Sequence, residues 1–418
     1  MRISTVTMFE QSVASLNRQQ GNLQHTSLQI ASGRRVVNPS DDPQAASRAV
    51  GVAQSMAITE QYNDSRISAR NTLSQTDTIL RSVVDAIDSA KGLLVQASSD
   101  TLSDVDRESI ASELKGIYET MIGQANATDG NGRYLFGGYK DNAQPFKEDA
   151  SGNMQYLGDN NVREQRIDAT RLMAVADNGQ TIFKSVPSSA GYIAEAKKDD
   201  GSLNSGNVTF RGPQIRDVSD PDYGTDFRIT FNTPADTFDV ETFDGTSWVP
   251  VAAQTGVTYT GDEGDSAQQV TYGGVSINLT GTPADEDSIL VAQAGGEQRE
   301  PNLFRSMAEA IRVLENPADT DAKKADLRNT LNTSMRDLDN GLNNVSTVLA
   351  SVGARVNELD VVDVVGGNRK LNYTETLSNL VDLDYADAIS EYSLRQVGLQ
   401  AAQKTFVDIK GLSLLNYM

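Results

Sequence analysis

With 418 residues, the chain is long enough for two or three domains that each have a hydrophobic core. Its net charge of −21 repels nucleic-acid phosphates and acidic membrane surfaces, so neither is an expected partner. Because the sequence contains no cysteine, disulfide scaffolds and thiolate chemistry are excluded.

The N-terminal 138 residues are predicted to be helical. In the first stretch, spacings of four and three alternate in a coiled-coil pattern with polar interruptions, through Phe9, Val13, Leu16, Gln20, Leu23, Ser27 and Ile30. This N-terminus lacks the apolar run of a cleaved secretory signal. No later stretch approaches the roughly 18 apolar residues that span a bilayer. Alone, these features predict a cytoplasmic protein, although export without signal cleavage stays open.

Residues 38–43 are predicted to end this helix and begin another, with Asp42 as the cap and Pro43 at the first helical position. A second heptad stripe follows, through Thr76, Leu80, Val83, Ile87, Ala90, Leu94 and Ala97. Ser103 and Asp106 have the spacing of a capping box. A third stripe then runs through Ile110, Leu114, Ile117, Met121 and Gln124.

Between residues 139 and 296 the hydrophobic period falls to two, which predicts antiparallel strands. Phe227, Ile229 and Phe231 alternate with polar residues, and the same pattern recurs at Val275, Ile277 and Leu279. The dipeptides at 244–245 and 273–274 are typical of hairpin turns. This block is predicted to be an inserted β domain, either a small sandwich or a set of hairpins.

The remaining chain, from residue 301, is predicted to be helical again. A long stripe runs through Leu331, Ser334, Leu338, Gly341, Val345, Val348, Val352, Arg355 and Leu359, and residues 365–368 are expected to interrupt it. The last helix has apolar residues on more than one side, at Ile389, Tyr392, Leu394, Val397, Leu399, Ala401 and Phe406. A helix with several partly apolar faces needs more than one neighbour, which favours self-assembly.

The predicted fold is mainly α with an inserted β domain. The helices from both chain ends pack together as long coiled coils, with the antiparallel β domain at the far tip. The expected segments are a terminal helix at 1–40, bundle halves at 41–138 and 297–376, the β domain at 139–296, and a second terminal helix at 377–418. The residues expected at contacts between subunits are Phe9, Val13, Leu16, Leu23, Ile30, Ile389, Tyr392, Leu399 and Phe406.

No motif in the sequence predicts catalysis, a cofactor or a metal site. His25 is the only histidine, and it is interpreted as a solvated helix residue. Asp41 and Asp42 fit a helix cap better than an acid/base pair. Residues 285–287 lack the spacing and the glycine of a calcium loop, so a solvated turn is expected there. The glycine-flanked residues 132–138 are expected to form a tight turn that packs on the helices.

Several short motifs at both ends of the chain resemble the bacterial flagellin superfamily. The resemblance covers both ends of the chain, about two-thirds of its length, and the motifs lie at residues 28–36, 39–46, 106–107, 352–357, 380–386 and 412–418. Three features resemble the junction proteins of that superfamily more than flagellin itself. They are the opening Met-Arg-Ile-Ser-Thr, the form Pro-Ser-Asp-Asp-Pro, and the pattern at residues 129–138.

This resemblance implies a non-enzymatic building block of the flagellum that joins hook to filament. Such proteins leave the cell by the flagellar type III route without signal cleavage, and their terminal helices form the inner tube of the axial structure. The implied partners are other copies of the chain, another hook-associated protein, flagellin and an export chaperone. Three alternatives remain: flagellin itself, an adhesin whose β domain binds a glycan, and an enzyme carried on a flagellin-like frame.

Overall fold

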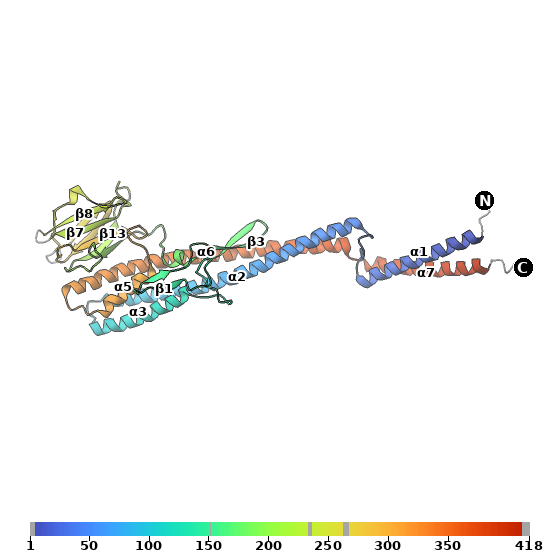
Figure 1. The fold of residues 1–418 in the computed structure, drawn as a ribbon, viewed down its shortest axis with the longest axis horizontal. Helices are drawn as coiled ribbons and strands as arrows, with labels where there is room; N and C mark the ends of the chain where they lie inside the picture. Colours follow the sequence, from blue (N-terminus) through green and yellow to red (C-terminus); the bar gives the residue numbers. More distant parts are fainter. Residues whose placement is uncertain (1–4, 151, 233–235, 262–266, 412–418) are drawn as a thin grey trace. The chain divides into compact units, whose positions relative to one another are not determined.

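The computed structural model describes residues 5–150, 152–232, 236–261 and 267–411. They fall into two compact units. The terminal unit consists of residues 1–66, 167–169 and 360–418, and the central unit consists of residues 67–166 and 170–359. Two long helices, α2 (Pro43–Ala97) and α6 (Asp321–Val381), contribute residues to both units. Figure 1 shows these elements coloured along the chain, and it confirms a mainly helical fold with an inserted β domain.

In the terminal unit, the helices from the two chain ends lie side by side (Figure 1). α1 (Thr5–Ser32) and α7 (Tyr385–Gly411) run antiparallel. Near one end of the pair, the ring centroids of Phe9 and Phe406 are 5.3 Å apart. Further along, the Nη1 of Arg395 donates to the carbonyl oxygen of Asn22 over 2.8 Å. The predicted pairing of the two chain ends is therefore present within one copy.

The predicted break between the first two helices is confirmed. α1 ends at Ser32, and Gly33 adopts a φ of 69°, a conformation that glycine takes at little cost. Before α2, the Oδ1 of Asp42 accepts the backbone N–H of Ala45 over 3.0 Å, as expected of a cap. The Oδ2 of Asp41 accepts two backbone N–H groups of the preceding turn, and these bonds lower the pKa of Asp41.

The helical stripes of the central unit form its core. Every member of the second stripe, from Thr76 to Ala97, is buried. The capping box of Ser103 and Asp106 is confirmed at the start of α3 (Asp104–Ala125). In α3 itself, Tyr118 and Ala125 are buried, whereas the expected Ile117 and Gln124 are only half-buried. The buried face is rotated because α3 packs on α5 (Leu303–Glu315), where Tyr118 meets Phe304 edge-on.

The expected interruption at residues 365–368 is wrong, because α6 runs through them without a break. Gly366 lies against Arg66, whose buried guanidinium donates to Asp363 and to the carbonyl oxygen of Ile167. A Cβ at position 366 would lie 2.7 Å from the Nη2 of Arg66. Gly366 therefore gives room to a buried cation instead of ending a helix. Gly367 has no heavy atom within 4 Å of its Cβ position.

Alanine substitutions at the two adjacent glycines should have opposite effects on the stability of α6. We expect Gly367→Ala to stabilise α6 by roughly 0.5–1 kcal/mol, because alanine loses less backbone entropy in a helix. We expect Gly366→Ala to destabilise it, because the added methyl group displaces Arg66 from its partners. Amide hydrogen exchange across residues 360–381 measures both effects. Slower exchange in Gly366→Ala than in the parent chain would contradict this account of Arg66.

The described residues of the β region form four sheets. Two hairpins come first, β1 (Phe146–Glu148) with β2 (Met154–Tyr156) and β3 (Arg163–Asp168) with β4 (Arg171–Ala176). After the short helix α4 (Gly179–Phe183), a six-stranded and a three-stranded sheet follow. Their strands are β5 (Tyr192–Ala196), β6 (Thr209–Ile215), β7 (Phe227–Asn232), β8 (Thr237–Phe243), β9 (Trp248–Pro250), β10 (Val257–Thr258), β11 (Gln268–Tyr272), β12 (Val275–Thr280) and β13 (Ser288–Gln293).

The two larger sheets share one hydrophobic core, so of the two predicted arrangements the structure is a sandwich. Its order is β10-β8-β7-β13-β5 in one sheet, with β9 on β8, and β11-β12-β6 in the other. Both alternating patterns, at 227–231 and 275–279, are buried on their apolar side. Both predicted turns connect paired strands: residues 244–245 lie between β8 and β9, and residues 273–274 join β11 to β12.

The first part of the block predicted as a β domain, residues 139–183, packs on the helices instead. Phe146 of β1 and Phe183 of α4 lie 5.2 and 5.6 Å from Phe304 of α5, measured between ring centroids. Phe136, from the expected tight turn at 132–138, meets Phe183 edge-on. The five predicted segment boundaries stay a prediction. The sandwich itself extends only over residues 192–293.

Candidate self-association surface

The described part of the terminal unit has almost no hydrophobic core. Its buried apolar side chains are Val36, Ala45, Ile167 and Ala388. Its exposed large apolar side chains are far more numerous, namely Met8, Phe9, Leu28, Val50, Ile58, Val361, Val364, Val365, Leu371, Tyr385, Ile389, Leu394, Val397 and Val407. Because burial of apolar surface is the main force in folding and association, these exposed side chains form a candidate association surface.

α7 has two apolar faces with different surroundings. One contains Tyr392, Leu399 and Phe406, all half-buried, and it faces α1. The other is largely exposed and contains Ile389, Leu394, Val397 and Val407, with exposed fractions of 54%, 73%, 63% and 62%. At 100° per residue Leu394 and Val397 project away from the first set, whereas Ile389 and Val407 lie on its flank, about 80° from its centre. We call these four residues the outer face of α7.

The structure therefore separates the residues expected at subunit contacts into two groups. Val13, Leu16, Leu23 and Ile30 of α1 are half-buried, as are Tyr392, Leu399 and Phe406 of α7. Phe9 and Ile389 are exposed, although the ring of Phe9 contacts Phe406. The role of all nine residues between subunits stays a prediction.

Sequence reasoning missed a second exposed apolar stripe on α6. It consists of Val361, Val364, Val365 and Leu371, all in the terminal unit. Their spacing places them on one side of the helix. The i, i+3, i+4 signal at 361–365 was present, but the expected helix break at 365–368 concealed it. The sequence therefore understated how much apolar surface the terminal unit leaves uncovered.

Most of the polar candidates have structural roles. The interpretation of His25 as a solvated residue is wrong, because its side chain is half-buried and its Nε2 is buried 3.1 Å from the Oδ1 of Asp41 in the turn after α1. The expectation of a solvated turn at 285–287 is wrong for Asp287. This carboxylate is fully buried and accepts the backbone N–H groups of Ser205, Gly206 and Ala284. The described residues contain no cluster of three His, Asp or Glu that could hold a metal.

Among the described helices, none combines the length and the apolar character needed to cross a bilayer.

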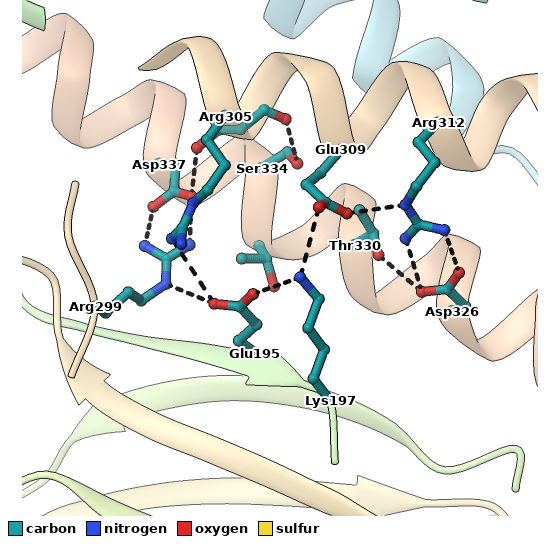
Figure 2. A network of polar contacts seen from close by, with 12 residues as sticks. Glu195, Lys197, Arg299, Arg305, Glu309, Arg312, Asp326, Thr330, Ser334 and Asp337 are labelled. Atoms are coloured by element: carbon teal, nitrogen blue, oxygen red, sulfur yellow. Dashed lines mark hydrogen bonds and ion pairs between the residues drawn. The ribbon is translucent and has the colours of Figure 1, made fainter. Parts of the chain in front are cut away.

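A network of charged side chains joins the sandwich to the helices, as Figure 2 shows. We call it the polar clamp. Its centre is Arg299, which makes two 2.6 Å bonds to Asp337 of α6 and one 3.2 Å bond to Glu195 of β5. Further members bond to this centre or to one another, namely Lys197, Arg305, Ser306 and Glu309. Sequence reasoning gave no sign of it, because its residues come from three distant segments.

The clamp holds Glu195 in its ionised form. Burial opposes ionisation, but Arg299, Lys197 and Arg305 outweigh it and lower the pKa of Glu195 to about 2. A lowered folded-state pKa stabilises the fold above the unfolded value of 4.5, and this contribution is lost as pH falls toward the folded value.

We therefore expect the free energy of unfolding to fall between about pH 4.5 and pH 2, partly through Glu195. Urea unfolding at a series of pH values measures the slope. The variant Glu195→Gln cannot titrate, so its stability should depend less steeply on pH in that range. An identical slope in both proteins would show that Glu195 is not held by the clamp in solution.

Comparison with known proteins gives consistent similarities. A family model described as the bacterial flagellin N-terminal helical region matches residues 3–141. Flagellar hook-associated protein 3 of Escherichia coli K12 is 32% identical over 415 residues, which are 99% of this chain and 98% of that protein. The protein of the same name from Salmonella typhimurium is 31% identical, again over 99% of this chain and 98% of the relative.

Solved structures are similar as well. The crystal structure of FlgL from Xanthomonas campestris is 26% identical, with a TM-score of 0.64 over 78% of this chain and 99% of that chain. A flagellar hook-associated protein-3 from Legionella pneumophila has a TM-score of 0.67 at 21% identity, over 79% and 98% of the two chains. The second likeness concerns the fold alone.

Proposed function

This chain belongs to the family of flagellar hook-associated protein 3, and we propose from that membership the contacts through which it works. It is a structural component of the bacterial flagellum, a junction protein between hook and filament that self-assembles through its terminal helices. The observation that carries the proposed contacts is the terminal unit, where few apolar side chains are buried and many are exposed.

The contacts are proposed as follows. Within one copy, α1 and α7 pair through their facing sides, where Phe9 meets Phe406. Between copies, the outer face of α7 packs against neighbouring subunits, because its leucine and valines are otherwise left in water. The α1 residues Val13, Leu16, Leu23 and Ile30 contribute the flanks of the same contacts. Each added copy then buries the apolar stripe that its neighbour exposes.

The individual binding partners are proposed from the same family membership. In the flagellum the chain contacts other copies of itself, another hook-associated protein on one side and flagellin on the other. A dedicated export chaperone covers its C-terminal helices before assembly, which would keep the outer face of α7 from aggregating. The chain leaves the cell through the flagellar export channel without signal cleavage, and it is not an enzyme.

The test is genetic. A strain that lacks this gene should make hooks without filaments and release flagellin into the medium, and the wild-type gene on a plasmid should restore filaments. Immunogold labelling of restored flagella should place the protein in a short band where hook meets filament. Labelling along the whole filament would indicate a filament subunit instead. Normal filaments in the deletion strain would reject the junction role for this chain.

A further inference from the structure

The β sandwich contains a complete hydrophobic core of its own. The apolar sides of β7, β8 and β13 face those of β6, β11 and β12, with fully or nearly fully buried residues on both sheets. These buried side chains all lie between residues 192 and 291. The sandwich therefore meets the main requirement for a unit that stays folded without the helices.

Its contact with α6 includes several hydrogen bonds from side chains of the helix to the backbone of the strands. Asn329 bonds the carbonyl oxygen of Val208 and the N–H of Phe210 over 2.9 and 3.2 Å. Thr333 donates to the carbonyl oxygen of Ala194 over 2.7 Å. Asn332 and Arg336 donate to further strand carbonyls in the same way. Amide, hydroxyl and guanidinium side chains of the helix thus bond directly to the backbone of the sandwich.

The polar clamp, which Figure 2 shows, lies beside these bonds. Only 3% of the Arg299 side chain is exposed, and 9% of its partner Asp337. A cavity of about 30 Å³ remains between β5, α5 and α6, lined by clamp residues such as Glu195, Arg299 and Glu309. Directed polar bonds therefore span the space between the sandwich and the helices. Side chains do not fill this space completely.

We propose that the polar clamp, with Arg299 at its centre, sets the orientation in which the self-contained β sandwich is held on α5 and α6. Apolar contacts are non-directional and tolerate rotation, whereas a bidentate arginine–carboxylate pair permits one geometry. Arg299 lies in the segment between β13 and α5, and it bonds the neighbouring edge strand β5 as well as α6. Loss of the guanidinium leaves both the sandwich and the helices folded, and it releases the sandwich to rotate.

The experiment uses the full chain and its single tryptophan, Trp248, which lies on β9 of the sandwich. Time-resolved fluorescence anisotropy of Trp248 reports how the sandwich rotates. In the parent chain it should rotate with the whole protein. In Arg299→Met we expect an added rotational component that is severalfold faster, while the emission maximum and the far-ultraviolet circular dichroism stay unchanged.

The matched control is Arg355→Met. Arg355 lies on α6 and, like Arg299, makes a bidentate pair, 2.8 and 3.0 Å from Asp177, but its partner is outside the sandwich. This variant should keep the slow rotation of the parent. Slow rotation in Arg299→Met, or a fast component of equal size in Arg355→Met, would overturn the proposal.

A second variant covers the case in which Arg299→Met fails to fold, since it leaves the buried carboxylate of Asp337 unpaired. The double variant Arg299→Met/Asp337→Leu removes both charges and keeps apolar volume at both positions. A folded double variant with fast Trp248 rotation would support the proposal. A folded double variant with slow rotation would refute it, and so would an unfolded sandwich.

Discussion

Leu394→Asp should abolish filament growth while the isolated protein unfolds as before. Leu394 is the most exposed member of the outer face of α7, at 73%, so the change places a carboxylate where water already lies in the single copy. Exposed substitutions of this kind alter the free energy of unfolding by about 0.5 kcal/mol or less. In the proposed assembly the same carboxylate is buried without a partner, and every added copy repeats that cost.

Complementation of the deletion strain measures the effect, with filaments counted by electron microscopy and the variant protein assayed in the medium. Secreted variant without filaments is the expected result. The control Val249→Asp makes the same kind of change at a 40% exposed site on β9 and should restore filaments. Leu399→Asp should differ from both variants in the stability of the isolated protein, because it also disturbs the α1–α7 pair. Full motility with Leu394→Asp would remove the outer face from the assembly contacts.

Phe304→Ala should have the largest effect on stability. Phe304 is 1% exposed, and its ring meets those of Tyr118, Phe146 and Phe183. It joins α3, α4, α5 and the first hairpin in one aromatic cluster. Truncation of a buried phenylalanine removes its transfer free energy and leaves a cavity, which together cost about 3–5 kcal/mol.

Denaturant unfolding followed by circular dichroism tests this expectation. Tyr139→Ala is the control, since Tyr139 is 62% exposed and should change the free energy of unfolding by about 0.5 kcal/mol or less. A loss below about 1 kcal/mol in Phe304→Ala would mean that the cluster collapses around the missing ring, as sites with room to relax do.

The sequence predicted those parts of the fold that depend on local periodicity and capping. The stripe from Thr76 to Ala97 was correct in every position, because one helix face stays against the same core throughout. Asp42 and Ser103 were correct because a cap depends on residues three or four apart. The sandwich strands were found for the same reason, since the side-chain period of a strand is two.

The failures arose where distant residues decide the structure. Two adjacent glycines predict a helix break, yet their local cost of about 1 kcal/mol each is outweighed by the packing of the long helix and by the space that Arg66 needs. The polar clamp was invisible because Glu195, Arg299 and Asp337 come from separate segments and each resembles an ordinary surface charge. Of the candidate site, the sequence found that α7 has more than one apolar face, and only the structure separated those faces.

Because the core of the terminal unit is small, the order of its helices should depend on the concentration of binding partners. If neighbouring copies supply the missing apolar contacts, the free energy that holds the terminal helices in place grows with the logarithm of the concentration of free binding partners. A single dilute copy then gains little from ordering its ends. At a growing tip the local concentration of partners is high, so each arriving chain should complete its fold where it is added and stay there.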